Sequence, residues 1–174
     1  NIGKNKDTPN EDFIEDYLKC LEGVYEAADY ITANLSSPNT KGLRDLQGED
    51  TCRELILRLK EKREDLRESA GGEYVPMVIK IAPDLEDDAV KGLAGVFSET
   101  GIDGVITTNT TIERAPVAGH SHAGEAGGLS GKPLTEKSTG VLALLRQEMD
   151  ASIPIIGSGG VMSAADARAK IDAG

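Results

Sequence analysis

Four short apolar runs, each followed by a polar loop and a longer helical pattern, dominate the arrangement of hydrophobic and polar positions along the chain. The runs lie at residues 30–35, 75–82, 104–108 and 153–157. Nearly continuous apolar character over so short a length is typical of parallel strands covered on both faces, whereas half-exposed antiparallel strands alternate. The pattern therefore predicts a buried parallel sheet.

Helical patterns lie between these runs. Residues 12–28 place apolar side chains at spacings of three and four, namely Phe13, Tyr17, Cys20, Leu21 and Val24. Residues 53–67 carry three leucines opposite a strongly charged face, namely Leu55, Leu57 and Leu59. Both segments are predicted to be amphipathic helices that cover the sheet.

Capping signals predict where two further helices begin. Pro83 followed by acidic residues indicates a helix that opens at Asp84, because carboxylates in a first turn complement the helix dipole. Ser163 and Asp166 have the spacing of a capping box. Strands that alternate with helices indicate an α/β fold, either a barrel or a doubly wound sheet. Polar residues follow several successive strands, which favours the barrel, whose sites are built from many strand ends.

The charge balance narrows the possible partners. The 174 residues include 30 acidic and 19 basic side chains, for a net charge of −11. Such a field repels nucleic acid and anionic lipid, so we expect no nucleic-acid partner. Cys20 and Cys52 have no metal or redox spacing, and His120 and His122 lie in a glycine-rich stretch at residues 112–129. We predict no metal site, and we interpret this stretch as a long loop of the kind that forms lids or binding loops.

Polar strand ends and one lysine are candidates for chemistry. Residues 34–40 and 107–111 are rich in Asn, Ser and Thr, although either could be a hydrogen-bonded turn. Lys80 lies between apolar neighbours, so it either reaches the surface along its stem or supplies a fixed positive charge to a bound anion. Residues 157–160 (Gly-Ser-Gly-Gly) precede a helix, where backbone N–H groups can approach a phosphate, although a plain turn fits equally.

Six segments in order resemble motifs of the dihydroorotate dehydrogenase family: residues 1–6, 34–44, 78–84, 108–111, 127–134 and 153–160. The match covers essentially the whole chain. It implies a (β/α)₈ TIM barrel, of which residues 1–174 form one partial FMN-binding domain, from about the end of strand three through helix seven. We therefore expect both ends of the chain to be cuts in a longer protein.

The resemblance also implies roles for individual residues. Ser37 stands where class 2 enzymes of the family have their catalytic base and class 1 enzymes have cysteine. The substrate contacts implied are Asn34, Asn39, Asn109 and Thr110. The FMN contacts implied are Asn1, Asn34, Lys80, Thr108, Ser130, Gly131, Gly159 and Gly160. Of these, Lys80 matches the lysine beside the flavin ring, and the last two glycines match the phosphate contacts.

The implied activity is FMN-dependent oxidation of dihydroorotate to orotate with a quinone acceptor, in pyrimidine (UMP) synthesis. The quinone-binding N-terminal extension of class 2 enzymes is not among these residues. The resemblance places the intact protein peripherally on the cytoplasmic side of a bacterial inner membrane, and we expect the present chain alone to be soluble and inactive. Two alternatives stay open, namely an FMN barrel similar to dihydrouridine synthases and an aldolase-like barrel with Lys80 as the Schiff-base nucleophile.

Overall fold

The chain folds as a parallel sheet with helices along one side. The computed structural model describes residues 1–38, 44 and 47–174. Its strands lie in the order β1 (Ile31–Asn34), β2 (Met77–Ile81), β3 (Gly104–Thr107) and β4 (Ile155–Gly157), and each neighbouring pair is parallel. Ile2 extends the arrangement with an isolated parallel bridge to Ala33. The predicted parallel sheet is confirmed, and each observed strand lies inside its predicted run.

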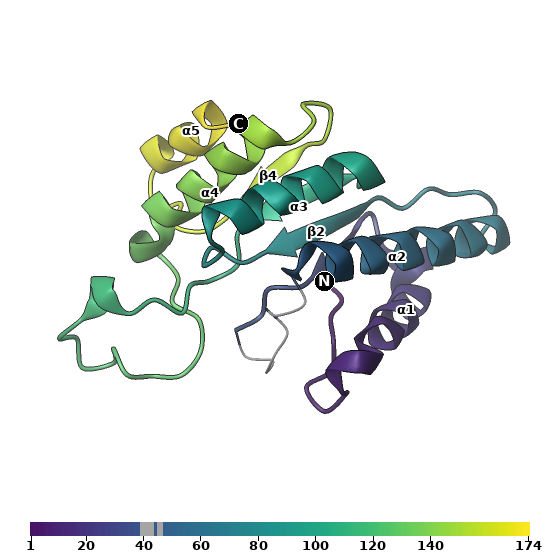
Figure 1. Cartoon of the computed structure of the whole chain (residues 1–174), viewed down its shortest axis with the longest axis horizontal. Coiled ribbons are helices and arrows are strands. Elements are labelled where there is room, and N and C mark those ends of the chain that lie inside the picture. The colour runs from purple at the N-terminus through teal and green to yellow at the C-terminus, as the bar shows by residue number, and fades with distance from the viewer. Residues whose placement is uncertain (39–43, 45–46) are drawn as a thin grey trace.

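The α-helices are α1 (Phe13–Val24), α2 (Glu49–Ser69), α3 (Asp87–Thr100), α4 (Thr135–Glu148) and α5 (Ala164–Asp172). Short 3₁₀ turns lie at η1 (Asn10–Asp12), η2 (Tyr25–Ala27), η4 (Ala115–Val117) and η5 (Lys132–Leu134). Successive helices pack against one another, and α2, α3 and α4 lie side by side along the sheet (Figure 1). None of the described helices combines the length and apolar character needed to cross a membrane.

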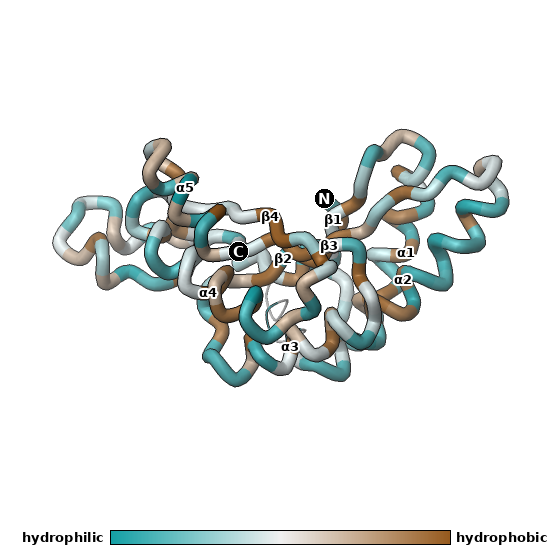
Figure 2. The backbone as a smooth tube through the Cα atoms, turned by 90° about the horizontal axis from the view of Figure 1, so that it is seen from above, coloured by the Kyte–Doolittle hydropathy of each residue, from teal (hydrophilic) through white to brown (hydrophobic). Residues whose placement is uncertain are grey.

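The strand order decides between the two α/β architectures. In a doubly wound sheet the strand order reverses at a switch point and helices cover both faces. Here the strands follow chain order, and helices α1 to α4 lie on the outer side of the curved sheet (Figure 2). The fold is therefore part of a TIM barrel, as predicted.

Alternation along the strands separates the helix-packed core from the inner face of the sheet. Ile79 and Ile81 on β2 belong to the core beneath the helices, together with Leu55 of α2 and Phe97 of α3. Since successive side chains of a strand point to opposite faces, Lys80 between them faces the inner side. The same strand thus stabilises the fold through one face and presents an amine on the other.

Three local predictions need correction. Asp84 does not open a helix: α3 begins at Asp87, and Glu86 before it has extended φ and ψ of −68° and 152°. Leu57 is 52% exposed, because positions two apart on a helix do not share a face with Leu55. Val24, assigned to the apolar stripe of the first helix, is also exposed, and α1 ends there.

Helices α4 and α5 differ in how clearly the sequence indicated where they begin. The predicted capping box of α5 is confirmed, since Ser163 Oγ accepts from the Asp166 N–H at 3.2 Å. Asp166 Oδ2 reaches back to the Met162 N–H at 3.0 Å, one residue before the cap. For α4, which follows the third run, no bounds were predicted, because its apolar residues form one continuous run at 141–145 and its start carries no side-chain cap.

Candidate active site at the carboxyl ends of the strands

A cavity of about 470 Å³ opens at the carboxyl ends of β2, β3 and β4. Its lining comprises Lys80, Thr108, Asn109, Thr110, Ser130, Gly131, Leu134, Gly157, Ser158, Gly159, Gly160, Val161 and Met162. Residues from four separate segments of the sequence thus meet at one end of the barrel segment, where TIM-barrel enzymes have their active sites. Most of the predicted cofactor residues line this cavity.

Lys80 supplies an amine to the cavity wall. Its neighbours across the sheet are Asn34 on β1 and Ile106 on β3, so the three residues share one row of the inner face. Lys80 is partly buried, and it lines the cavity instead of lying on the outer surface. The arrangement suits attraction of an anionic group bound in the cavity.

A hydrogen-bonded cluster connects the ends of β1 and β3. Asn109 Nδ2 donates to Asn34 Oδ1 at 3.2 Å and to Ser36 Oγ at 3.1 Å. Ser36 Oγ donates in turn to Asn34 Oδ1 at 2.8 Å, and the Thr110 N–H donates to Asn109 Oδ1 at 2.8 Å. These contacts fix the orientation of both amides, each of which has both donor and acceptor atoms. Ser37, the partly buried residue after this cluster, lies at the same end of the sheet.

Two glycines that line the cavity have conformations and surroundings that exclude other residues. Gly160 has φ of 72°, and a Cβ there would lie 2.4 Å from the Thr135 backbone nitrogen. Gly159 has φ of 99°, and a Cβ there would lie 2.8 Å from the Leu134 side chain. The loop after β4 is therefore pressed against the start of α4, with its backbone exposed to the cavity.

Asp84 joins the loops around the site, a role that its sequence position did not reveal. Its carboxylate accepts from Arg44 Nη1 at 2.6 Å, Lys137 Nζ at 2.8 Å, the Ile112 N–H at 3.0 Å and Thr111 Oγ1. Although burial by itself raises the pKa of Asp84, these hydrogen bonds lower it to about 2. The carboxylate is thus ionised at neutral pH and holds cations from two other segments.

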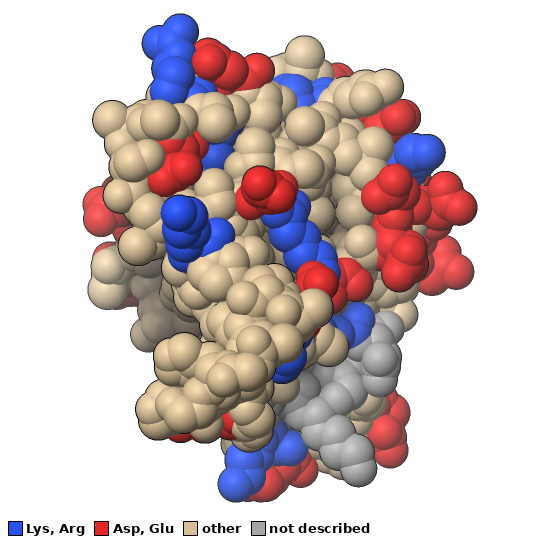
Figure 3. Space-filling view, turned by 90° about the vertical axis from the view of Figure 1, so that its left-hand side faces the viewer, with Lys and Arg blue, Asp and Glu red and all other residues tan. Residues whose placement is uncertain are grey.

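Arg44 extends this network to the segment that carries Ser37. Its Nη2 donates to the Thr110 carbonyl at 2.8 Å, and its Nε donates to the Ser36 carbonyl at 3.3 Å. The guanidinium therefore contacts the carbonyls of two residues of the amide cluster, one after β1 and one after β3. Figure 3 shows this end of the molecule, where Lys and Arg side chains are interspersed with Asp and Glu. Among the described residues of this face, Lys and Arg form no continuous basic surface of the kind that binds nucleic acid.

The remaining predicted site residues have other positions. Asn1 is exposed beside β1 and is not among the residues that line the cavity, although Ile2 next to it bonds to the Thr32 carbonyl at 2.8 Å. Asn34 takes part through the amide cluster, not through the cavity wall. Asn39 lies outside the described residues.

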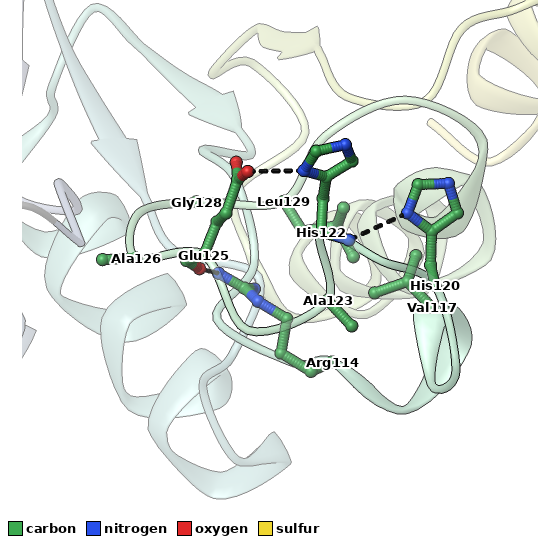
Figure 4. A pocket seen from close by; sticks show the side chains of 9 residues that line it. All are labelled: Arg114, Val117, His120, His122, Ala123, Glu125, Ala126, Gly128 and Leu129. Carbon is green, nitrogen blue, oxygen red and sulfur yellow. Dashed lines mark hydrogen bonds and ion pairs between the residues drawn. The ribbon is translucent and has the colours of Figure 1, made fainter.

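The predicted long loop is present between β3 and η5, and it encloses a separate pocket of about 300 Å³ (Figure 4). Arg114 closes its base by donating to the carbonyls of Gly127 at 2.5 Å and Glu125 at 3.2 Å. His122 Nδ1 lies 2.6 Å from Glu125 Oε1 and thus has a carboxylate partner that the sequence did not reveal. Within the described residues, no cluster of three or more potential metal ligands occurs.

The family model for dihydroorotate dehydrogenase matches residues 1–174, which is the full length of the chain. The chain belongs to the dihydroorotate dehydrogenase family. Curated relatives named dihydroorotate dehydrogenase (quinone) include one from Stenotrophomonas maltophilia (strain K279a), 54% identical, and one from Flavobacterium lutescens, 57% identical. All 174 residues align with each, but they cover only 49% of either relative. The chain spans about half the length of these relatives.

Solved structures of this family have the same fold. The structure of a dihydroorotate dehydrogenase from Eimeria tenella in complex with ferulenol superposes with a TM-score of 0.92 at 40% identity, over 99% of this chain and 48% of that one. The ligand-free enzyme from Eimeria tenella gives a TM-score of 0.91 at 41% identity, over 100% of this chain and 50% of that one. The half of the dihydroorotate dehydrogenase fold found here includes the described cavity.

Proposed function

We propose that the protein containing this chain oxidises dihydroorotate to orotate with FMN as cofactor and a quinone as electron acceptor, a reaction of pyrimidine synthesis. The observation that carries the proposal is the meeting of Lys80, the Asn34–Asn109 amide pair and the glycine loop at one end of a barrel segment. The names of the relatives support the substrate and the acceptor. In this family, enzymes are generally flavin-dependent.

The residues present fit FMN. Lys80, Thr108 and Ser130 offer an amine and hydroxyls along the cavity, suited to a flavin ring that carries hydrogen-bonding groups. Gly159 and Gly160 expose backbone at one end of the cavity, where a phosphate monoester would be held by N–H groups. When bound, the flavin supplies the chemistry of accepting a hydride and passing two electrons to the quinone.

Ser37 is the proposed base. It would remove the proton from C5 of dihydroorotate while a hydride leaves C6, so that a C5=C6 double bond forms. A serine hydroxyl is a weak base and must pass its proton onward. Thr110 follows Asn109 in the cluster beside Ser37, and its hydroxyl is a candidate for the next carrier. Asn34 and Asn109 would hold the pyrimidine edge, with Asn39 as a third amide and Asn1 as a further flavin contact.

The proposed location follows from the class of enzyme. The quinone-dependent relatives suggest that the whole protein associates peripherally with the cytoplasmic side of a bacterial inner membrane, where quinones dissolve. The quinone would bind through residues outside this chain. Fractionation of cells that express the complete protein, with and without high salt, would check this.

The test of the activity is anaerobic mixing of the complete protein with dihydroorotate while the visible flavin band is followed. Bleaching that reverses on addition of a quinone is the expected result. In Ser37→Ala the bleaching should slow by a factor of about 10² to 10⁴, the usual contribution of general-base catalysis. Ser69→Ala is the matched control, because Ser69 is an exposed residue at the end of α2 and does not line the cavity. A bound flavin that ignores dihydroorotate would refute the substrate, and a protein without flavin would point to Lys80 as a Schiff-base nucleophile.

A further inference from the structure

Lys170 of α5 is a buried amine outside the cavity described above. It is 5% exposed, and its Nζ lies 2.7 Å from Ser138 Oγ and 3.2 Å from Thr139 Oγ1, both on α4. Burial lowers the pKa of Lys170, while the charge of Asp166 acts in the opposite direction. Burying an ammonium group against neutral hydroxyls is costly, so this position calls for an explanation.

The hydrogen-bond directions are determined by the chemistry of the donors. An ammonium group only donates, so Ser138 Oγ must accept from Lys170. The proton of Ser138 is then directed to a carbonyl, and the shorter of its two contacts is to Gly159 at 2.9 Å, against 3.3 Å to Thr135. A hydrogen bond from a charged donor polarises the hydroxyl and strengthens the bond that it donates in turn.

This chain of contacts orients the peptide groups of the glycine loop. The Gly159–Gly160 peptide bond is trans, so its C=O and N–H point in opposite directions. Ser138 holds the Gly159 carbonyl toward α4, and the Gly160 N–H is therefore turned away from α4. Thr135 Oγ1 donates to the Gly160 carbonyl at 2.6 Å. Because the Gly160–Val161 peptide bond is also trans, the Val161 N–H is turned away from Thr135.

Both N–H groups belong to residues that line the cavity at the ends of the strands. A flip of either peptide group would break its hydrogen bond to Ser138 or Thr135. The close approach of Gly160 to the Thr135 backbone also leaves the loop little room to move. Two adjacent N–H groups held in a fixed direction form the kind of backbone site that binds an anion. The hydroxyls and the lysine lie behind the loop, on the side of α4 and α5, and do not line the cavity themselves.

We propose that Lys170, Ser138 and Thr135 form a brace that fixes the Gly160 and Val161 N–H groups for the phosphate of FMN. The inference rests on the proposed function and adds three positioning residues to it. The brace acts on the phosphate alone, because the flavin ring would lie toward Lys80 and Thr108. Substitution of a brace residue should therefore weaken FMN binding and leave riboflavin binding unchanged, because riboflavin has the same ring but no phosphate.

The experiment compares FMN with riboflavin by fluorescence titration of the complete protein after removal of its flavin. Ser138→Ala should weaken FMN binding about tenfold, the effect of one lost charge-assisted hydrogen bond, and leave riboflavin binding unchanged. Lys170→Met should act in the same direction. The matched control is Ser69→Ala, since Ser69 Oγ also donates to a helix carbonyl, that of Asp65 at 2.8 Å. It should leave the affinities for both flavins unchanged.

A second measurement does not depend on affinity. The ³¹P resonance of FMN bound to Ser138→Ala should shift relative to the wild-type complex, whereas that of the Ser69→Ala complex should not. Equal losses for both flavins, or unchanged FMN affinity and ³¹P shift in Ser138→Ala, would overturn the brace. If the wild-type protein bound both flavins equally yet was reduced by dihydroorotate, the brace would fail and the proposed function would stand. If dihydroorotate did not reduce the bound flavin, but Ser138→Ala lost its preference for FMN over riboflavin, the brace would be supported and the proposed substrate would be wrong.

Discussion

Arg44 and Asp84 form an ion pair with an N–O distance of 2.6 Å between the loop after β1 and the loop after β2. Because Arg44 also donates to the Thr110 carbonyl at 2.8 Å, the pair connects these loops to the one after β3. The loops after β1 and β3 carry residues of the proposed site, and the loop after β2 contributes Asp84, which binds to both. The pair therefore provides a means of holding the Ser37 segment against Asn109 and Thr110.

Replacement of Arg44 by lysine should impair the chemical step more than cofactor binding. A lysine keeps the charge but cannot reproduce the planar set of donors that reaches Asp84, Ser36 and Thr110. We expect flavin reduction by dihydroorotate to slow about 10- to 100-fold, the kinetic equivalent of losing one or two hydrogen bonds. FMN affinity should not change. Arg53→Lys is the control, since Arg53 forms its ion pairs with Asp50 of α2 and Glu99 of α3 and does not contact the site. A parallel loss of FMN affinity in Arg44→Lys would contradict the prediction.

The lowered pKa of Asp84 predicts a pH-dependent contribution to stability. Its pKa falls from 3.8 in the unfolded chain to about 2 in the folded one, so the ionised carboxylate stabilises the native state above pH 3.8. This contribution should disappear as the pH falls through the window from about 4 to about 2. Asp84→Asn should therefore be less stable than the wild type at pH 7, with the difference narrowing in that window. Urea unfolding of the complete protein at several pH values measures it.

Asp65→Asn serves as the control for this titration, because Asp65 is exposed on α2. Its unfolding midpoint should follow the wild type at every pH. A stability difference for Asp84→Asn that stayed constant from pH 7 to pH 2 would show that the carboxylate does not stabilise the fold through its charge.

Arg63 is expected to be the charged side chain of α2 with the largest effect on stability. It is 4% exposed, and its Nη1 donates to Asp103 Oδ2 at 2.6 Å and to Tyr74 Oη at 2.8 Å. Its guanidinium also lies 4.4 Å from the centre of the Tyr74 ring. Removing one partner of a buried ion pair leaves the other charge unpaired, so Arg63→Met should lower the free energy of unfolding by about 3 kcal/mol.

The matched variant for Arg63 is Arg58→Met on the exposed side of the same helix, where the ion pair with Glu61 is 3.7 Å long. Denaturant unfolding should show a change of less than about 1 kcal/mol for that variant. Equal effects of the two substitutions would contradict a structural role for the buried cluster.

Alanine variants of Gly160 and Gly119 distinguish the effect of backbone strain from the effect of a steric clash. Both have positive φ, 72° and 86°, but a Cβ at Gly119 would meet no atom within 4 Å. Gly119→Ala should cost only the strain of a left-handed conformation, about 1–2 kcal/mol or less in a loop, and should leave FMN binding unchanged. Gly160→Ala must also displace the loop from Thr135, and we expect it to weaken FMN binding at least tenfold. Flavin titration of both variants decides the matter.

Several features of this protein follow from residues that are close in sequence. The apolar runs predicted the strands, because a buried parallel strand needs apolar side chains on both faces. The capping box predicted the start of α5, because Ser163 and Asp166 bond across a single turn. The Gly-Ser-Gly-Gly segment and Lys80 were likewise recognisable as candidates for the cavity wall. Such signals depend on local geometry and on motif order, both of which can be read along the chain.

Other features depend on contacts between distant segments. The prediction of a helix start at Asp84 was wrong because acidic residues after a proline are typical of a first helical turn. The true partners of Asp84, Arg44 and Lys137, lie 40 and 53 positions away in the sequence. Lys170 and Ser138 are 32 positions apart, and nothing in either segment indicates their contact. Leu57 lies exposed between buried leucines because packing selects one face of α2.

The division has a physical reason. Backbone preferences and side-chain periodicity act over a few residues, so the amino-acid order determines which elements form and which polar groups stand at their ends. The partner of a buried charge is chosen by the packing of whole elements, which brings α4 against α5 and joins three loops around Asp84. Only the tertiary structure could therefore reveal the ion pair that spans the site and the brace behind the glycine loop.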